Sequence, residues 1–219
     1  MKVITFDAGN TLIRLNQPVG VTYAAVAERF GVKLAPASLE RGFKAAWKSV
    51  PPLPEAPGPR PDDGRSWWRA VVIQTLELTG EKVEPFDNYF DAVYREFGLP
   101  GIWRLEPGAL DLLSDLRVAG FRLGIISNFD LRLRHILEHL GVLDFFEQII
   151  ISSQIGADKP SPRIFQAAIE RFGVEPQEML HVGDDKAADG DGARQAGMQT
   201  FILGLGGSGL KELRERVGL

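Results

Sequence analysis

Lys2-Val-Ile-Thr-Phe-Asp-Ala-Gly-Asn-Thr-Leu12 joins a short apolar run to a tight turn. Residues 3–6 are rich in β-branched and aromatic side chains, which is typical of a short buried strand. The run ends at Asp7, and Gly9 and Asn10 are residue types that favour tight turns. Open α/β sheets bind their ligands at the carboxyl ends of parallel strands. Asp7 is therefore a candidate functional carboxylate, although a turn-forming role explains this stretch equally well.

The composition is that of a globular protein. The chain has 219 residues, enough for one large domain or one domain with an insert, and 44% of them are apolar. A net charge of −4 gives no sign of a nucleic-acid or membrane partner, and the absence of cysteine excludes disulfides and thiolate zinc sites. No signal peptide is recognisable, and no apolar run approaches the roughly 20 residues of a transmembrane helix. We expect a cytoplasmic protein that acts on a small molecule.

Residues 16–104 are expected to form an all-helical insert. Apolar residues at helical spacing predict four helices, at residues 21–30, 36–47, 67–78 and 86–97. Between the second and the third, residues 51–61 contain six prolines, so no regular element can persist there. This proline-rich stretch is predicted to be a surface loop.

From Pro107 onward, predicted helices alternate with predicted strands. The strands are expected at residues 122–126, 148–151, 179–182 and 200–203, with helices between and after them. This alternation predicts parallel β-α-β units with right-handed connections. We therefore predict an α/β protein whose core, residues 1–15 and 105–219, is a doubly wound, Rossmann-like parallel sheet. The helical insert follows the first strand, where it would act as a cap on the ligand-binding edge.

Four polar residues are predicted to meet at this edge. Asp7, Ser127 and Asp184 follow the first, second and fourth strands of the core, and Lys159 lies in the loop after the third. A carboxylate can attack phosphorus, while a hydroxyl and an ammonium can bind phosphoryl oxygens and offset their charge. A second carboxylate can join Asp7 in holding a Mg²⁺ ion. This set of residue types indicates phosphoryl chemistry.

The same stretches resemble the motifs of the haloacid dehalogenase-like (HAD) hydrolase superfamily. Residues 7–11 are similar to the first motif, which reads Asp-x-Asp-Gly-Thr in phosphatases, and residues 125–128 are similar to the second. Lys159-Pro160 looks like the third motif, and residues 183–189 look like the fourth. The helical insert is similar to the type 1 cap of this superfamily. Three stretches, residues 127–130, 159–165 and 181–184, resemble the subgroup of haloacid dehalogenase-like hydrolase domain-containing protein 3.

The resemblance implies catalytic and binding roles. Asp7 would be the nucleophile. Thr11 and Ser127 would hold phosphoryl oxygens or orient Asp7, with Asn128 beside them as a substrate-binding residue. Lys159 would offset negative charge at the reacting phosphoryl group.

The resemblance also implies a Mg²⁺ site. Asp7 and Asp184 would be ligands, and Asp189 would be a further ligand or would support one. The backbone carbonyl of Gly9 would complete the set, because that contribution needs no side chain.

Gly9 is the main departure from the phosphatase motif. In that motif the position of Gly9 is an aspartate, which protonates the leaving oxygen and later activates water. General acid–base catalysis of this kind typically accelerates a reaction 10²–10⁴-fold. Three functions are therefore considered. The first is a slow Mg²⁺-dependent phosphohydrolase of a small phosphorylated metabolite. The second is a dehalogenase-like hydrolase that uses Asp7 without metal, and the third is a non-catalytic phosphate- and metal-binding protein.

Other polar residues have simpler explanations. Arg60, Arg65 and Arg104 are candidates to bind an anionic substrate, but a solvated surface position accounts for each of them more simply. His181 lies within a predicted buried strand, where a hydrogen-bonded core histidine is commoner than a catalytic one.

Overall fold

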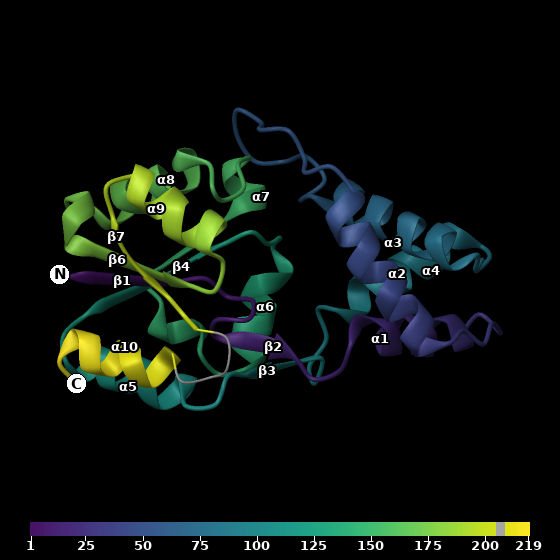
Figure 1. Cartoon of the computed structure of the whole chain (residues 1–219), viewed down its shortest axis with the longest axis horizontal. Coiled ribbons are helices and arrows are strands. Elements are labelled where there is room, and N and C mark those ends of the chain that lie inside the picture. Colours follow the sequence, from purple (N-terminus) through teal and green to yellow (C-terminus); the bar gives the residue numbers. More distant parts are fainter. Residues whose placement is uncertain (205–208) are drawn as a thin grey trace. The chain divides into compact units, whose positions relative to one another are not determined.

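The computed structural model describes residues 1–204 and 209–219 and divides into two compact units (Figure 1). The first unit comprises Met1–Arg14, Glu55–Asp63 and Arg104–Leu219. The second comprises Leu15–Pro54 and Gly64–Trp103. Across the described residues, no helix has the length and apolar character needed to cross a membrane.

The first unit is built on a five-stranded parallel sheet with the strand order β5-β4-β1-β6-β7. The strands are β1 (Val3–Phe6), β4 (Arg122–Ser127), β5 (Gln148–Ile151), β6 (Met179–Gly183) and β7 (Gln199–Ile202). The chain winds outward from β1 through β4 to β5, and then returns to β6 on the other side of β1. This order confirms the predicted doubly wound α/β fold and places a topological switch point between β1 and β6.

The register brings the ends of three strands to one edge. Phe6 of β1 pairs with Ile125 of β4 and with Val182 of β6. The three strands therefore end close together at the carboxyl edge of the sheet. Asp7 and Asp184 follow the ends of neighbouring strands, on either side of the switch point.

Helices cover both faces of the sheet in the first unit. Figure 1 shows α8 and α9 on one face and α5 and α10 on the other. On the first of these faces, Ile126 and Ile150 of the sheet pack against Phe165 and Phe172 of α8. The helical elements are α5 (Ala109–Val118), α6 (Arg132–His139), η1 (Leu143–Phe145), α7 (Ser152–Ile155), α8 (Pro162–Phe172), η2 (Pro176–Glu178), the π-helix η3 (Lys186–Asp191), α9 (Gly192–Gln195) and α10 (Gly209–Val217).

The second unit contains the four helices that the sequence predicts. They are α1 (Val19–Glu28), α2 (Pro36–Ser49), α3 (Arg65–Thr79) and α4 (Phe86–Glu96). Their core includes Tyr23, Leu39 and Tyr89, and the Tyr89 hydroxyl donates to the Tyr23 carbonyl at 3.2 Å. The short strands β2 (Ile13–Leu15) and β3 (Trp103–Leu105) pair where the chain passes between units, and the sequence did not predict them.

The proline-rich stretch has no helix or strand from residue 51 to residue 60, as expected. The segment Glu55–Asp63, which overlaps this stretch, groups with the first unit, although these residues lie inside the expected insert. The Ala56 amide donates to the Gly156 carbonyl at 2.8 Å, and the Arg60 amide donates to the Ser153 carbonyl at 2.7 Å. This part of the loop is therefore anchored to the α/β core by its backbone.

Candidate active site

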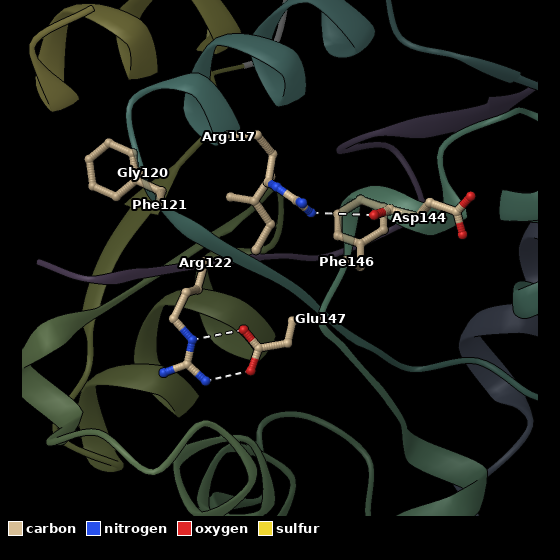
Figure 2. Close-up of a pocket in the computed structure, with 8 residues that line it drawn as sticks. Arg117, Gly120, Phe121, Arg122, Asp144, Phe146 and Glu147 are labelled. Carbon is tan, nitrogen blue, oxygen red and sulfur yellow. Dashed lines mark hydrogen bonds and ion pairs between the residues drawn. The ribbon is translucent and has the colours of Figure 1, made fainter.

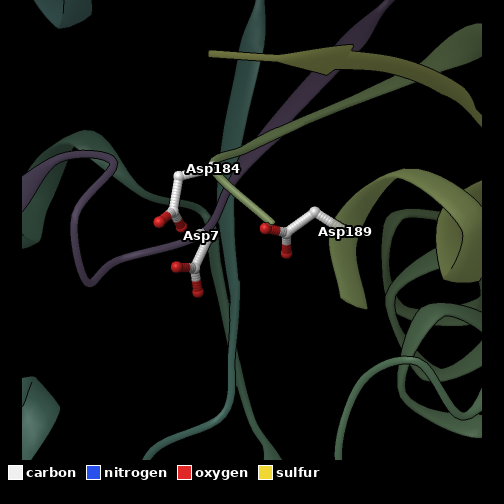
Figure 3. A group of neighbouring side chains, drawn as sticks. All are labelled: Asp7, Asp184 and Asp189. Atoms are coloured by element: carbon white, nitrogen blue, oxygen red, sulfur yellow. The ribbon is translucent and has the colours of Figure 1, made fainter. Parts of the chain in front are cut away.

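Three carboxylates meet at the carboxyl edge of the sheet. Asp7 follows β1, Asp184 follows β6, and Asp189 lies in the π-helix η3. One oxygen of each lies within 4.8 Å of the others. Figure 3 shows Asp7 and Asp184 side by side at the strand ends, with Asp189 facing them from the helical segment. Such a cluster of hard oxygen donors suits a divalent cation of the Mg²⁺ type.

Lys159 is buried between two of these carboxylates. Its ammonium donates to Asp7 Oδ1 at 2.7 Å, to Asp189 Oδ1 at 2.6 Å and to the Ile126 carbonyl at 2.9 Å. All three of its N–H groups are therefore used. Burial by itself would lower the pKa of Lys159, but the attraction of Asp7 and Asp189 outweighs it and raises the pKa above its ordinary value. Lys159 is thus a fixed positive charge beside Asp7.

Asn128 holds the backbone of Lys159. Its side-chain nitrogen donates to the Lys159 carbonyl at 3.0 Å, and its side-chain oxygen accepts from the Lys159 amide at 2.6 Å. The sequence predicted that Asn128 binds substrate. The structure shows its side-chain amide paired with the backbone of Lys159, and the binding of substrate stays a prediction.

Two hydroxyl groups complete the set that the sequence predicted. Ser127 is buried at the end of β4. The hydroxyl of Thr11 is buried and has no hydrogen-bond partner within the part of the chain that the structure describes. An unpaired buried hydroxyl is unfavourable unless a ligand completes it, so Thr11 is available to an oxygen of a bound molecule.

His181 links the sheet to the carboxylate cluster, a role that the sequence did not reveal. Its Nε2 lies 3.1 Å from Asp189 Oδ1, and its Nδ1 lies 3.0 Å from Thr5 Oγ1. Burial lowers the pKa of His181, so the ring is neutral. Because the ionised Asp189 can only accept, Nε2 carries the proton and Nδ1 accepts from the threonine.

Asp189 is the most firmly held of the three carboxylates. Besides Lys159 and His181, the Asp185 amide donates to its Oδ2 at 3.0 Å. Burial opposes its ionisation, but the hydrogen bond from His181 and the charge of Lys159 outweigh this and hold the pKa of Asp189 well below its usual range. The Asp185 side chain caps the π-helix by accepting from the Ala187 and Ala188 amides, both at 2.8 Å. A π-helix of this kind is frequent at functional sites.

The carboxyl group of Asp184 has a raised pKa. Partial burial of its carboxyl group and the negative charges of Asp7 and Asp189 raise the pKa of Asp184 to about 6. The repulsion among the three carboxylates is therefore only partly offset by Lys159. A cation bound between them would relieve the rest.

Gly183 lies against Asp189 so closely that it leaves no room for a side chain. A Cβ at this position would lie 2.1 Å from Asp189 Cγ. We expect Gly183→Ala to lower the free energy of unfolding by about 1–3 kcal/mol, because Asp189 must move away from its donors. Urea denaturation followed by circular dichroism would measure the loss.

The matched control for this variant is Gly9→Ala. A Cβ on Gly9 would have nothing within 4 Å, so its effect should stay within about 0.5 kcal/mol. Equal losses at the two glycines would contradict the crowding of Asp189.

Gly9 sits in the turn after Asp7. The Leu12 and Ile13 amides both donate to the Ala8 carbonyl, at 2.9 and 3.0 Å, and Asn10 adopts a positive φ of 55°. The open space around Gly9 means that packing does not require glycine there. A Cβ can therefore be added at this position without a clash.

The three candidate arginines have different environments. Arg60 is only 8% exposed and donates to both oxygens of Asp158, at 3.0 and 2.8 Å. The expected solvated position is therefore wrong for this residue. Arg65 pairs with Asp91 in the second unit, and Arg104 is exposed.

A separate hollow in the first unit involves none of the predicted site residues (Figure 2). It lies at the start of β4, at the opposite edge of the sheet. Its arginines already have partners: Arg122 pairs with Glu147, and Arg117 donates to the carbonyls of Asp144 and Phe145. We assign no function to it.

A family model for haloacid dehalogenase-like hydrolases matches residues 1–197. The chain belongs to the haloacid dehalogenase-like hydrolase family. It is 36% identical to haloacid dehalogenase-like hydrolase domain-containing protein 3 from Homo sapiens, over 93% of this chain and 82% of that protein. These findings confirm the resemblance to the HAD superfamily and to this subgroup, and they make the chain a hydrolase.

Solved structures share the HAD fold. The YfnB protein of Bacillus subtilis, solved bound to magnesium, has a TM-score of 0.75 at 20% identity, over 100% of this chain and 99% of that one. A HAD phosphatase from Thermococcus onnurineus has a TM-score of 0.69 at 24% identity, over 100% of this chain and 98% of that one. At these identities the likeness shows a common fold.

Proposed function

We propose that this HAD-like hydrolase is a Mg²⁺-dependent phosphohydrolase that acts on a small phosphorylated metabolite through an aspartyl-phosphate on Asp7. The observation that carries the proposal is the buried Lys159 ammonium, held between Asp7 and Asp189 at the carboxyl edge of the sheet. A carboxylate beside a fixed cation can approach an anionic phosphoryl group, which it would otherwise repel. Magnesium bound to one structural neighbour and the phosphatase among the others support the same function.

Three side chains would surround the phosphoryl group: two hydroxyls that would bind its oxygens, and one ammonium that would offset their charge. The buried hydroxyl of Thr11 has a free hydrogen-bonding capacity within the described residues. Ser127 ends the neighbouring strand β4, and Lys159 brings positive charge. Together these groups would orient phosphorus toward Asp7 and offset the charge of its oxygens in the transition state.

The reaction would proceed in two displacements. An oxygen of Asp7 forms a bond to phosphorus while the bond from phosphorus to the leaving oxygen breaks, and the leaving oxygen keeps the electron pair. Water then bonds to phosphorus, the bond to the Asp7 oxygen breaks, and inorganic phosphate is released. Gly9 supplies no proton to the leaving oxygen and accepts none from the water. Leaving groups that depart as stable anions should therefore react fastest.

The donor set fits a Mg²⁺ ion. Asp7, Asp184 and Asp189 would hold it together with the carbonyl of Gly9, and their mutual repulsion, visible in the raised pKa of Asp184, is of the kind that a cation relieves. When bound, Mg²⁺ supplies positive charge at the phosphoryl oxygens. Asp184 must be ionised to bind Mg²⁺.

The proposal predicts metal-dependent hydrolysis of p-nitrophenyl phosphate. At pH 7.5 we expect slow turnover with Mg²⁺, preceded by a burst of about one nitrophenolate per enzyme, and no turnover after chelation. The burst should occur because nitrophenolate leaves without a proton, whereas attack of water lacks a base. Chelator-insensitive activity, or no burst and no turnover, would contradict the proposal.

The pH dependence of Mg²⁺ binding follows from Asp184. Its folded-state pKa of about 6 lies above the ordinary value of 3.8. The metal-free protein therefore loses stability from this group as pH rises through 6, and Mg²⁺ should restore it. The increase in Tm produced by Mg²⁺ should be larger at pH 7.5 than at pH 5.0. Equal increases at the two pH values would show that Asp184 is not a ligand.

Gly9 favours one other function, a dehalogenase-like hydrolysis of a non-phosphate bond. A halide leaves carbon without needing a proton, so the missing acid would cause no loss there. That reaction would use Asp7 alone and would be unaffected by chelation. Turnover of a 2-haloacid in EDTA, with none of p-nitrophenyl phosphate, would favour it.

A further inference from the structure

We propose that Arg60 is a positioning residue for Lys159. The stretch Glu55–Asp63 thereby becomes part of the framework of the active site, although it lies within the inserted segment. The inference rests on the proposed function, in which Lys159 must stand beside Asp7.

The first contact is the ion pair between Arg60 and Asp158. Both terminal nitrogens of Arg60 donate to the two oxygens of Asp158, at 3.0 and 2.8 Å. The side chain of Arg60 is 7% exposed and that of Asp158 is 29% exposed, so the guanidinium is shielded from water while the carboxylate is partly open to it. A bidentate pair fixes direction as well as distance. Asp158 immediately precedes Lys159, so the pair fixes the backbone that leads into the lysine.

The stretch Glu55–Asp63 is itself held in place by the segment after β4 and by the short helix α7. Asp63 accepts from the Leu131 amide at 2.8 Å and from the Gln154 side chain at 3.2 Å, and it also pairs with the Ser153 hydroxyl. The Arg60 amide donates to the Ser153 carbonyl at 2.7 Å. The segment after β4 and the short helix α7 after β5 therefore hold the stretch that carries Arg60.

Lys159 is then held from two sides. Asn128 pairs with its backbone from the loop after β4, and Arg60 holds the preceding residue. No helix or strand includes Ala157, Asp158 or Lys159, so these contacts do the positioning. The ammonium must reach Asp7, Asp189 and the Ile126 carbonyl at once, and a shift of about 1 Å is enough to lose much of the catalytic benefit.

The test compares Arg60→Ala, Arg60→Lys and Asp158→Asn with the wild type. The assay uses p-nitrophenyl phosphate and saturating Mg²⁺ at a temperature well below the Tm of the variant. We expect kcat of Arg60→Ala to be about 10- to 100-fold lower than that of the wild type. Arg60→Lys keeps the charge but not the bidentate pairing, so it should recover part of the loss. Arg122→Ala is the matched control, because it breaks another paired arginine–carboxylate contact, with Glu147, at the opposite edge of the sheet.

Amide hydrogen exchange gives a readout that does not need turnover. The Lys159 amide, which donates to Asn128, should exchange at least about tenfold faster in Arg60→Ala, and should be unchanged in Arg122→Ala. If the variant were only less stable, its activity would fall in proportion to the fraction of folded protein. Exchange would then become faster at many amides and not selectively at the Lys159 amide.

A second variant, Gly156→Ala, should displace the stretch Glu55–Asp63 while leaving the Arg60 side chain itself unchanged. Gly156 has a φ of +76°, and a Cβ there would lie 2.2 Å from the Gly58 carbonyl oxygen and 2.7 Å from that of Ala56. Gly173 has a similar φ of +62°, but a Cβ there would have nothing within 4 Å. Alanine at either glycine adds the same left-handed strain. Only Gly156→Ala should lower kcat and speed exchange at Lys159.

The outcomes separate the inference from the proposed function. If the wild type turns over while Arg60→Ala keeps its kcat within twofold, Arg60 is not a positioning residue and the phosphohydrolase stands. Faster exchange with unchanged kcat would overturn the inference as well. If the wild type shows no turnover and no burst, the proposed function fails, and the exchange of Lys159 in Arg60→Ala and Gly156→Ala still decides whether Arg60 orders this loop.

Discussion

Replacing Asp7 by asparagine should abolish hydrolysis and leave the protein folded. The amide is not a nucleophile toward phosphorus, so no aspartyl-phosphate forms. Removal of a nucleophile from such a constellation lowers kcat by roughly 10³–10⁶-fold. The amide oxygen can still accept from Lys159, which now donates to Asp7 Oδ1 at 2.7 Å, so the cluster should persist. The measurement is the burst and the steady state with p-nitrophenyl phosphate and Mg²⁺.

The same variant has a second expected effect, on Asp184. The charge of Asp7 is one of the causes that raise the pKa of Asp184 to about 6. Its removal should lower that pKa toward the ordinary value, and NMR of the carboxyl carbon would detect the change. Asp111→Asn, at an exposed position on α5, is the control for the chemical change itself. Turnover of Asp7→Asn within tenfold of the wild type would rule out the covalent mechanism.

The fold could be predicted from the sequence because the core strands are short, continuous apolar runs. β1 and β5 have the predicted bounds, and β4 and β6 extend only one residue further. Parallel strands end at one edge, so the polar residues after them had to meet there. The grouping of Asp7 and Asp184 follows from that rule, whereas Lys159 reaches them from the loop beyond α7.

Other features could not be predicted, for identifiable reasons. β2 and β3 have three residues each, too few for a periodic pattern. The π-helix η3 has no distinct composition, and the sequence predicted an ordinary helix there. The pair Arg60–Asp158 joins residues 98 positions apart, and a proline-rich loop gives no sign of a buried arginine. The pairing of the Asn128 amide with the backbone of Lys159 is visible only in the fold.

Introducing an aspartate at Gly9 should increase turnover. A Cβ there meets nothing within 4 Å, and Gly9 itself has a φ outside the left-handed region, so a side chain can start there without displacing a neighbour. The new carboxyl group would stand two residues after Asp7, in the turn that carries it. General acid–base help of this kind typically contributes 10²–10⁴-fold. We expect Gly9→Asp to raise the steady-state rate with p-nitrophenyl phosphate by about that factor.

The two displacements should respond differently to Gly9→Asp. Nitrophenolate needs no proton, so the rate of the burst phase should change little, while attack of water on the aspartyl-phosphate should accelerate and the burst amplitude should fall. With an alkyl phosphate, whose leaving oxygen does need a proton, both displacements should gain, and the acceleration should be larger. Gly9→Asn is the matched control, because it has the same shape and no carboxyl group. Equal rates for the aspartate and asparagine variants would mean that Gly9 does not limit the reaction, and that the slow step lies elsewhere in the site.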